Sequence, residues 1–193
     1  MAGAEILILR VAQAQDSARA RADIEAIFFE AAGPRTFERE QARAEFRHRW
    51  LTRYLDHFPD EIFIAATNTG EIIGYLVGCL EDPAGHPLFA DITYFPAFAH
   101  LTPAFPAHLH INLTSAARGQ GIGKHLIAAF AEHARAHGVP GIHAVTGDGV
   151  RNNSFYAACG FHRASTTLWN GRAIAFFARA CADPVATPPG GGP

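Results

Sequence analysis

The stretch Arg118-Gly119-Gln120-Gly121-Ile122-Gly123-Lys124 decides the fold that the sequence predicts. Residues 108–114 before it alternate polar and apolar side chains, as a β-strand does, and residues 122–137 after it have helical spacing. The alternate glycines let the backbone bend sharply and keep side chains away from its N–H groups. The first N–H groups of a helix lack internal partners, and the helix dipole makes that end electropositive. A phosphate or pyrophosphate site is therefore expected here, and a glycine-rich turn without a ligand is the alternative.

Two better-known phosphate-binding loops do not fit this stretch. A P-loop requires Gly-x-x-x-x-Gly-Lys-Ser/Thr, but Arg118 stands at its first glycine and His125 at its final hydroxyl residue. A dinucleotide fingerprint requires Gly-x-Gly-x-x-Gly, and here the third glycine, Gly123, comes one residue early. The pattern that remains is Arg-x-x-Gly-x-Gly, formed by Arg118, Gly121 and Gly123.

Length, charge and cysteine content narrow the class of protein. A chain of 193 residues suits one domain with a sizeable core. The net charge of −2 argues against nucleic-acid binding, which usually needs a basic surface. Three widely spaced cysteines form neither a zinc motif nor a disulfide framework, and no apolar run suits a signal peptide or a membrane span. We therefore expect a soluble cytoplasmic protein.

The hydrophobic pattern predicts an α/β (α+β) domain over residues 1–181, with helices packed on a mixed sheet. Residues 182–193 are rich in proline and glycine and are expected to form a flexible tail. The expected strands are 5–12, 61–66, 72–80, 108–114, 142–146, 162–169 and 172–179. The expected helices are 16–32, 36–57, 122–137 and a short one that ends at residue 159.

Two regions of the chain have no single interpretation. Residues 82–106 are rich in proline and aromatic side chains, which argues for an ordered excursion, either a wall beside the substrate or a surface for self-association. Four arginines flank the apolar stripe of the expected helix 36–57. They either form a solvated face or contact a coenzyme phosphate or an acidic substrate; they are Arg43, Arg47, Arg49 and Arg53.

A second motif supports a specific family. The run Phe155-Tyr156-Ala157-Ala158-Cys159-Gly160-Phe161 is similar to the Phe-Tyr-x-x-x-Gly-Phe signature of the GCN5-related N-acetyltransferases, the GNAT superfamily. Arg118-x-x-Gly121-x-Gly123 resembles the acyl-CoA pyrophosphate loop of the same family. The resemblance covers Glu5 to Ala180 and implies one domain with a mixed, mostly antiparallel central sheet flanked by helices. Residues 106–111 also resemble bacterial acetyltransferases related to the C-terminal domain of O-GlcNAcase.

The resemblance implies that acetyl-CoA is the cofactor. In the family, the loop amides hold the pyrophosphate, and the preceding strand pairs with pantetheine. The strand near Val145 would then splay away to admit the acetyl group. The coenzyme-binding residues carried over in this way are Asn112, Leu113, Thr114, Arg118, Gly119, Gln120, Gly121, Ile122, Gly123, Lys124, Asn153 and Tyr156.

One position departs from the family pattern. Family members commonly place an asparagine six residues before the phenylalanine of the Phe-Tyr pair, and Gly149 stands there in this chain. Asn152 or Asn153 would serve instead if the loop shifted, and Asn153 is the one we carry over. Helix capping explains either asparagine equally well.

The resemblance also implies catalytic residues. Tyr156 falls at the position of the general acid beside the thioester sulfur, and a core aromatic with a satisfied hydroxyl is the alternative. His108 and His110 share one face of their strand, and His110 is the candidate base for an amine. A hydrogen-bonded core histidine is the alternative for His110. Asp91 and Asp148 are further candidate bases in loops.

No metal site is expected. His133 and His137 are spaced i, i+4 on one helix, but the helix lacks the glutamate of a metalloprotease motif, and no third ligand is evident.

The expected function is therefore direct transfer of acetyl from acetyl-CoA to the amine of a small molecule or a protein. The rival hypothesis is a non-catalytic acyl-CoA-binding or protein-interaction module on the same fold. Neither a nucleic acid nor a membrane is expected as a partner, and the sequence predicts no oligomeric state.

Overall fold

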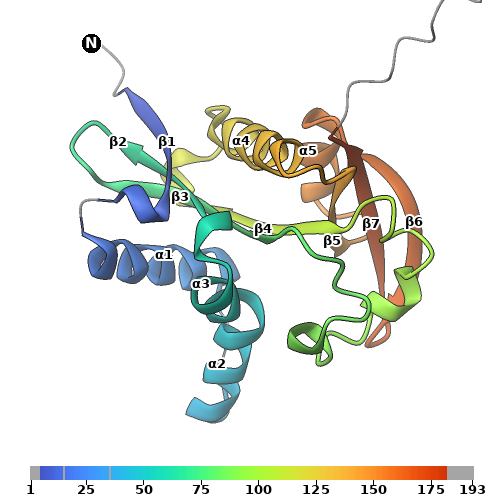
Figure 1. The fold of residues 1–193 in the computed structure, drawn as a ribbon. Coiled ribbons are helices and arrows are strands. Elements are labelled where there is room, and N and C mark those ends of the chain that lie inside the picture. The colour runs from blue at the N-terminus through green and yellow to red at the C-terminus, as the bar shows by residue number, and fades with distance from the viewer. Residues whose placement is uncertain (1–4, 15, 35, 182–193) are drawn as a thin grey trace, which may run out of the picture.

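A seven-stranded sheet in the order β1-β2-β3-β4-β5-β7-β6 forms the centre of the computed structural model, which describes residues 5–14, 16–34 and 36–181 (Figure 1). All neighbouring strands run antiparallel except β4 and β5. The strands are β1 Ile6–Arg10, β2 Phe63–Thr67, β3 Ile72–Cys79, β4 Ala107–Leu113, β5 Gly141–Gly147, β6 His162–Trp169 and β7 Arg172–Ala180. The sheet confirms the mixed, mostly antiparallel architecture expected from the sequence.

Helices cover both faces of this sheet. In Figure 1, α4 (Ile122–Ala136) and α5 (Asn152–Ala158) lie on one face. On the other face lie α1 (Ser17–Ala32), α2 (Glu40–Arg47) and α3 (Arg53–His57). Since side chains alternate along a strand, β1, β2, β3, β5 and β7 each contribute to two hydrophobic clusters, one under each layer of helices.

The parallel pair at the centre of the sheet is short. β4 and β5 pair only through Ala107 with Ile142 and His108 with His143, although each strand continues beyond these residues. The rest of β4 pairs with β3 alone. The two strands therefore separate on the side that leads to the glycine loop, as the sequence resemblance implied.

The helix expected over residues 36–57 differs in detail. It begins at Glu40, and a π-helical turn over His48–Thr52 separates α2 from α3. Leu51 is fully buried, and Arg53, Tyr54 and Leu55 in the turn that follows are also buried. Three consecutive buried positions exceed what one stripe of a regular α-helix supplies, and the wider turn directs more side chains toward the sheet.

Residues 82–106 pack on the face of the sheet that carries α1, α2 and α3. Aromatic side chains of this segment, including Phe89, Phe95 and Phe98, join the hydrophobic cluster there. Arg53 fastens the segment to α3, because its guanidinium donates to the carbonyl of Leu88 at 2.5 Å and to Asp91 at 2.8 Å. The segment is thus an ordered part of the domain, and both of its expected roles, a wall beside the substrate and a surface for self-association, stay predictions.

The remaining expectations concern the ends of the chain and membranes. The tail predicted over 182–193 lies outside the described residues. Within the described ranges, every helix is too short or too polar to cross a bilayer.

Candidate active site

The glycine loop after β4 presents unpaired backbone amides. Gly119 and Gly121 have φ of 79° and 81°, which favour glycine because a Cβ is strained in the left-handed region. Gly121 caps α4, and its carbonyl accepts from the N–H of Lys124 at 2.9 Å. Among the residues that the structure describes, no acceptor receives a hydrogen bond from the backbone N–H groups of residues 119–123. These amides sit at the positive end of a four-turn helix and suit an anion.

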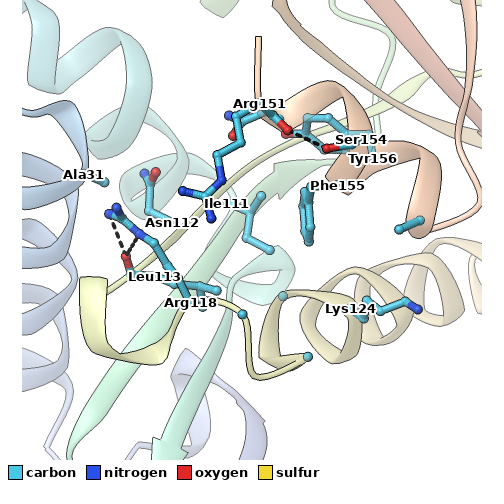
Figure 2. Close-up of a pocket in the computed structure, with 15 residues that line it drawn as sticks. Ala31, Ile111, Asn112, Leu113, Arg118, Lys124, Arg151, Ser154, Phe155 and Tyr156 are labelled. Carbon is cyan, nitrogen blue, oxygen red and sulfur yellow. Dashed lines mark hydrogen bonds between the residues drawn. The ribbon is translucent and has the colours of Figure 1, made fainter.

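A cavity of about 570 Å³ adjoins this loop and runs to α5 (Figure 2). It contains no aspartate or glutamate, whereas three of its lining residues are cations. The lining residues are Ala31, Ile111, Asn112, Leu113, Arg118, Gly119, Gly121, Gly123, Lys124, Arg151, Asn152, Ser154, Phe155, Tyr156 and Ala158. Net positive charge beside free amides favours a ligand that carries several negative charges, as a diphosphate does.

The two large cations of the cavity face it from opposite sides. Arg118 is held in place because its guanidinium donates to the carbonyl of Leu113, at 3.3 and 3.2 Å. Arg151, at the start of α5, extends its guanidinium toward Asn112 and Ile111 in Figure 2.

Several residues carried over from the resemblance contribute through the backbone or the packing. Thr114 directly follows β4, and its N–H donates to the carbonyl of Ile73 at 3.0 Å. Gln120 folds back, since its side-chain amide donates to the carbonyl of Ala116 at 2.7 Å. Ile122 is buried beneath the first turn of α4. The side chains of these three residues do not line the cavity, although Gln120 and Ile122 contribute free amides.

Tyr156, on α5, lines the cavity. Its ring is buried, stacks on Phe177 and meets the edge of Phe161. Burial raises the pKa of its hydroxyl, so the group is protonated at neutral pH. The described residues offer this hydroxyl no hydrogen-bond partner, although Tyr156 lines the cavity. A protonated hydroxyl without a partner, on a residue that lines the cavity, is suited to donate to a ligand.

The two asparagines at the start of α5 have different environments. Asn152 lines the cavity. Asn153 instead closes the loop after β5: in its favoured amide orientation it donates to the carbonyl of Gly147 at 3.0 Å and accepts from the N–H of Gly149 at 2.9 Å. Asn152 therefore faces the space that a coenzyme would occupy, and Asn153 shapes the loop that borders it.

His110 lies on the opposite face of β4 from the aliphatic floor of the cavity. Its Nε2 atom is 3.1 Å from the hydroxyl oxygen of Tyr54, and the edge of Trp50 packs on its ring. Burial lowers the pKa of His110 to about 4, so the imidazole is neutral at pH 7 and is a weaker base than an exposed histidine. Asn112, on the same face of the strand, donates to the hydroxyl of Tyr75 at 2.7 Å.

The two loop carboxylates considered as bases are engaged by arginines. Asp148 forms a 2.6 Å ion pair with Arg163, and Asp91 pairs with Arg53 and Arg49. Arg43 and Arg47 likewise pair with Glu40 and Glu25, so all four arginines of residues 40–57 have carboxylate partners within the fold.

No metal site is found in the part of the chain that the structure describes, where no three metal-ligating side chains are suitably grouped. His133 and His137 do contact each other, with ring centroids 4.3 Å apart.

Comparison with known proteins identifies the family. The sequence model of the acetyltransferase (GNAT) family matches residues 21–161, and the chain belongs to this family. Among curated protein sequences, none matches the chain significantly. The narrower resemblance to the acetyltransferases related to O-GlcNAcase stays a prediction.

Solved structures share the fold at low sequence identity. A protein named SsHAT aligns with a TM-score of 0.72 and 19% identity over 93% of this chain and 100% of its own. A protein from Pyrococcus horikoshii aligns with a TM-score of 0.68 and 13% identity over 91% and 98% of the two chains. An N-acetyltransferase from Staphylococcus aureus aligns with a TM-score of 0.59 and 18% identity over 92% and 99%.

Membership of the family establishes the general chemistry as acetyl transfer and the cofactor as acetyl-CoA. The loop and cavity fit this cofactor, because its diphosphate needs amides and cations and its pantetheine needs a narrow apolar path. Sequence reasoning missed several lining residues, notably Arg151, and it weighed Asn152 but carried over Asn153, whereas Asn152 is the asparagine that lines the cavity. The cation in the turn before the Phe155-Tyr156 pair is a signal that could have identified Arg151.

Proposed function

We propose that this protein is an N-acetyltransferase that moves the acetyl group directly from acetyl-CoA to an amine. The observation that carries the proposal is the run of free amides at residues 119–123 beside a cavity that is lined by three cations, no carboxylate and Tyr156. The acceptor is the amine of a small molecule or a protein. The three cysteines are free thiols, which a reducing cytoplasm maintains, and acetyl-CoA is a metabolic cofactor. Both points favour a cytoplasmic location.

In this mechanism, the bound coenzyme supplies the thioester. The amides of residues 119–123 hold its diphosphate, with Arg118, Lys124 and Arg151 as counter-charges. Residues 112–114 guide pantetheine along the open edge of β4. As the carbon–sulfur bond breaks, Tyr156 would donate its proton to the departing sulfur while the amine nitrogen forms the new bond to the carbonyl carbon. The proton that this nitrogen then loses would pass through water and restore the Tyr156 hydroxyl.

His110 is the proposed catalytic residue on the acceptor side. Its low pKa keeps the ring neutral at pH 7, so it does not repel an incoming cationic amine. The same low pKa makes His110 a poor acceptor for the proton that the amine must lose before it attacks. We therefore assign His110 to contact with the reacting groups and the final uptake of that proton to water.

A non-catalytic acyl-CoA-binding module is the second candidate. It is favoured by one observation, which is that every carboxylate considered as a base is tied to an arginine.

Two measurements separate these candidates. Thermal unfolding with acetyl-CoA at 100 times its Kd should show stabilisation of about 2.7 kcal/mol. Release of free CoA should then follow on addition of one or more members of a panel of primary amines. Absence of any thermal shift would exclude both candidates, and a shift without CoA release across the panel would favour the module.

A further inference from the structure

A tyrosine on α3 holds two histidines of β4 through one oxygen atom. The hydroxyl oxygen of Tyr54 lies 3.1 Å from Nε2 of His108 and 3.1 Å from Nε2 of His110. Tyr54 and His108 are buried, and His110 is half-buried. Since His108 and His110 are two residues apart, both rings project from the same face of β4 and converge on this oxygen.

The chemistry of a hydroxyl makes the two histidines unequal. Burial lowers the pKa of both, so each ring is neutral at pH 7 and has one N–H and one bare nitrogen. The Tyr54 hydroxyl has a single hydrogen, which it donates to one Nε2, and it accepts from the other. One histidine must therefore carry its proton on Nε2 and the other on Nδ1.

The surroundings of His108 show which of the two histidines carries its proton on Nε2 and which carries it on Nδ1. His143 stacks on His108 and donates its Nδ1–H to the carbonyl of Phe105 at 2.5 Å, because a carbonyl only accepts. Nδ1 of His108 is buried and has no partner among the described residues. A buried donor without a partner is rarer than an unpaired acceptor, so Nδ1 of His108 is the bare nitrogen. His108 then donates from Nε2 to Tyr54, and Tyr54 donates to His110.

We infer that Tyr54 is a positioning residue that holds His110 with its proton on Nδ1. This inference rests on the proposed function, in which His110 contacts the reacting groups. Tyr54 engages Nε2 of His110, and no described residue hydrogen-bonds to Nδ1, so Nδ1 is the nitrogen left for a ligand. His110 thus offers an N–H donor, which suits the carbonyl oxygen of the acetyl group as negative charge develops there.

The assignment changes the role expected for His110. A ring that already carries its proton on the ligand-facing nitrogen cannot take one from the amine at that atom. His110 therefore acts as a hydrogen-bond donor and not as the general base. Tyr54 itself needs no contact with the substrate, because its hydrogen bond to Nε2 of His110 sets where the proton of that ring lies.

The direct test is nitrogen NMR of protein labelled with ¹⁵N-histidine, in which protonated and bare ring nitrogens have separate shifts. His110→Gln and His108→Gln identify the signals of the two rings. We expect His110 to be protonated on Nδ1 and His108 on Nε2. In Tyr54→Phe, the His110 signals should move toward a mixture of tautomers, and kcat should fall about tenfold with KM for acetyl-CoA unchanged.

Tyr75→Phe is the matched control for the spectrum. Tyr75 is also buried, and its hydroxyl serves Asn112 on the same strand, so removing it should leave the His110 tautomer unchanged. Wild-type His110 protonated on Nε2 would overturn the inference even if Tyr54→Phe failed to fold. So would a Tyr54→Phe protein with the wild-type spectrum.

The test also separates this inference from the proposed function. The tautomers are measured without substrate, so the expected spectrum combined with no CoA release would reject the N-acetyltransferase and leave the role of Tyr54 in place. CoA release with His110 protonated on Nε2 would support the N-acetyltransferase and reject the role of Tyr54.

Discussion

Gly123 in the first turn of α4 lies directly against the ring of Phe155 in α5. A Cβ at Gly123 would come within 2.9 Å of Cε2 and Cζ of Phe155. This approach brings the glycine loop and the Phe155-Tyr156 pair together around one cavity. The two motifs, which are separate in the sequence, therefore depend on each other for their geometry.

Gly123→Ala should damage both motifs at once. The added methyl group must push Phe155 aside, because 2.9 Å is shorter than a carbon–carbon contact, and overpacking of this kind costs about 1–3 kcal/mol. Urea unfolding should show this loss, and acetyl-CoA affinity should fall as well. Phe155→Leu in the same protein should restore part of the stability. A Gly123→Ala protein with wild-type stability and affinity would mean that the ring of Phe155 can move aside at no cost in stability.

Gly121→Glu should abolish acetyl-CoA binding. The new carboxylate would lie at the free amides and repel the diphosphate, while the positive φ of 81° adds strain of about 1–2 kcal/mol. Gly138→Glu is the matched control, because Gly138 has φ of 73° and open space around it but lies beyond the other end of α4. Calorimetry should find binding only in the control. Equal affinities in both folded variants would place the coenzyme elsewhere.

Arg151→Gln should weaken acetyl-CoA binding about tenfold, which is about 1.4 kcal/mol. The side chain faces a cavity without carboxylates, so its charge has no other partner there. Affinity in the variant should also depend less on salt, because one ion pair is lost. Arg172→Gln, an exposed change at the start of β7, serves as the control. Comparison with dephospho-CoA would show whether Arg151 engages the 3′-phosphate or the diphosphate.

Tyr156→Phe should lower kcat by about 10²–10⁴-fold and leave the Kd of acetyl-CoA nearly unchanged. The hydroxyl is the only part of the side chain removed, and the stacking on Phe177 remains. Steady-state kinetics and calorimetry on the same preparation make the comparison. An unchanged kcat would return Tyr156 to a purely structural role.

Asp91→Asn should destabilise the protein at neutral pH but not in acid. Burial alone would raise the pKa of Asp91, but the guanidiniums of Arg53 and Arg49 outweigh it and lower the pKa to about 2. The stabilising contribution is therefore complete above the unfolded-state pKa of about 4 and disappears as the pH falls toward 2. We expect the variant to lose about 1–3 kcal/mol at pH 7, because it leaves the charge of buried Arg53 without its carboxylate.

Urea unfolding at pH 7, 5 and 3 measures this dependence. The difference between wild type and Asp91→Asn should be equal at pH 7 and 5 and smaller at pH 3. A difference that does not change with pH would show that the ion pair contributes nothing.

The sequence predicted those parts of the fold that depend on local pattern. The glycine loop, the helix after it and the final hairpin around Asn170-Gly171 are encoded by residues adjacent in the chain, and the structure confirms them. The π-helical turn at 48–52 was not predicted, because Phe46, Trp50 and Tyr54 have the same spacing whether the turn is regular or wide.

The site was predicted less completely, because its side chains meet only in three dimensions. The contact between Tyr54 and His110 joins residues 56 positions apart, and no local sequence pattern predicts it. The difference between Asn152 and Asn153 depends on the path of the loop at 147–150. The low pKa of His110 follows from burial by Trp50 and Tyr54, which the strand sequence alone does not reveal.

The early separation of β4 from β5 has a mechanical consequence. Past His108 and His143 the two strands leave a seam in the middle of the sheet, where each lacks the neighbour that a continuous ladder would provide. An extended pantetheine arm that filled this seam would join the two halves of the sheet. The bound coenzyme would then bridge β4 and β5, and its release would remove the bridge. The coenzyme-bound protein would therefore resist sliding of one half of the sheet past the other more than the free protein does.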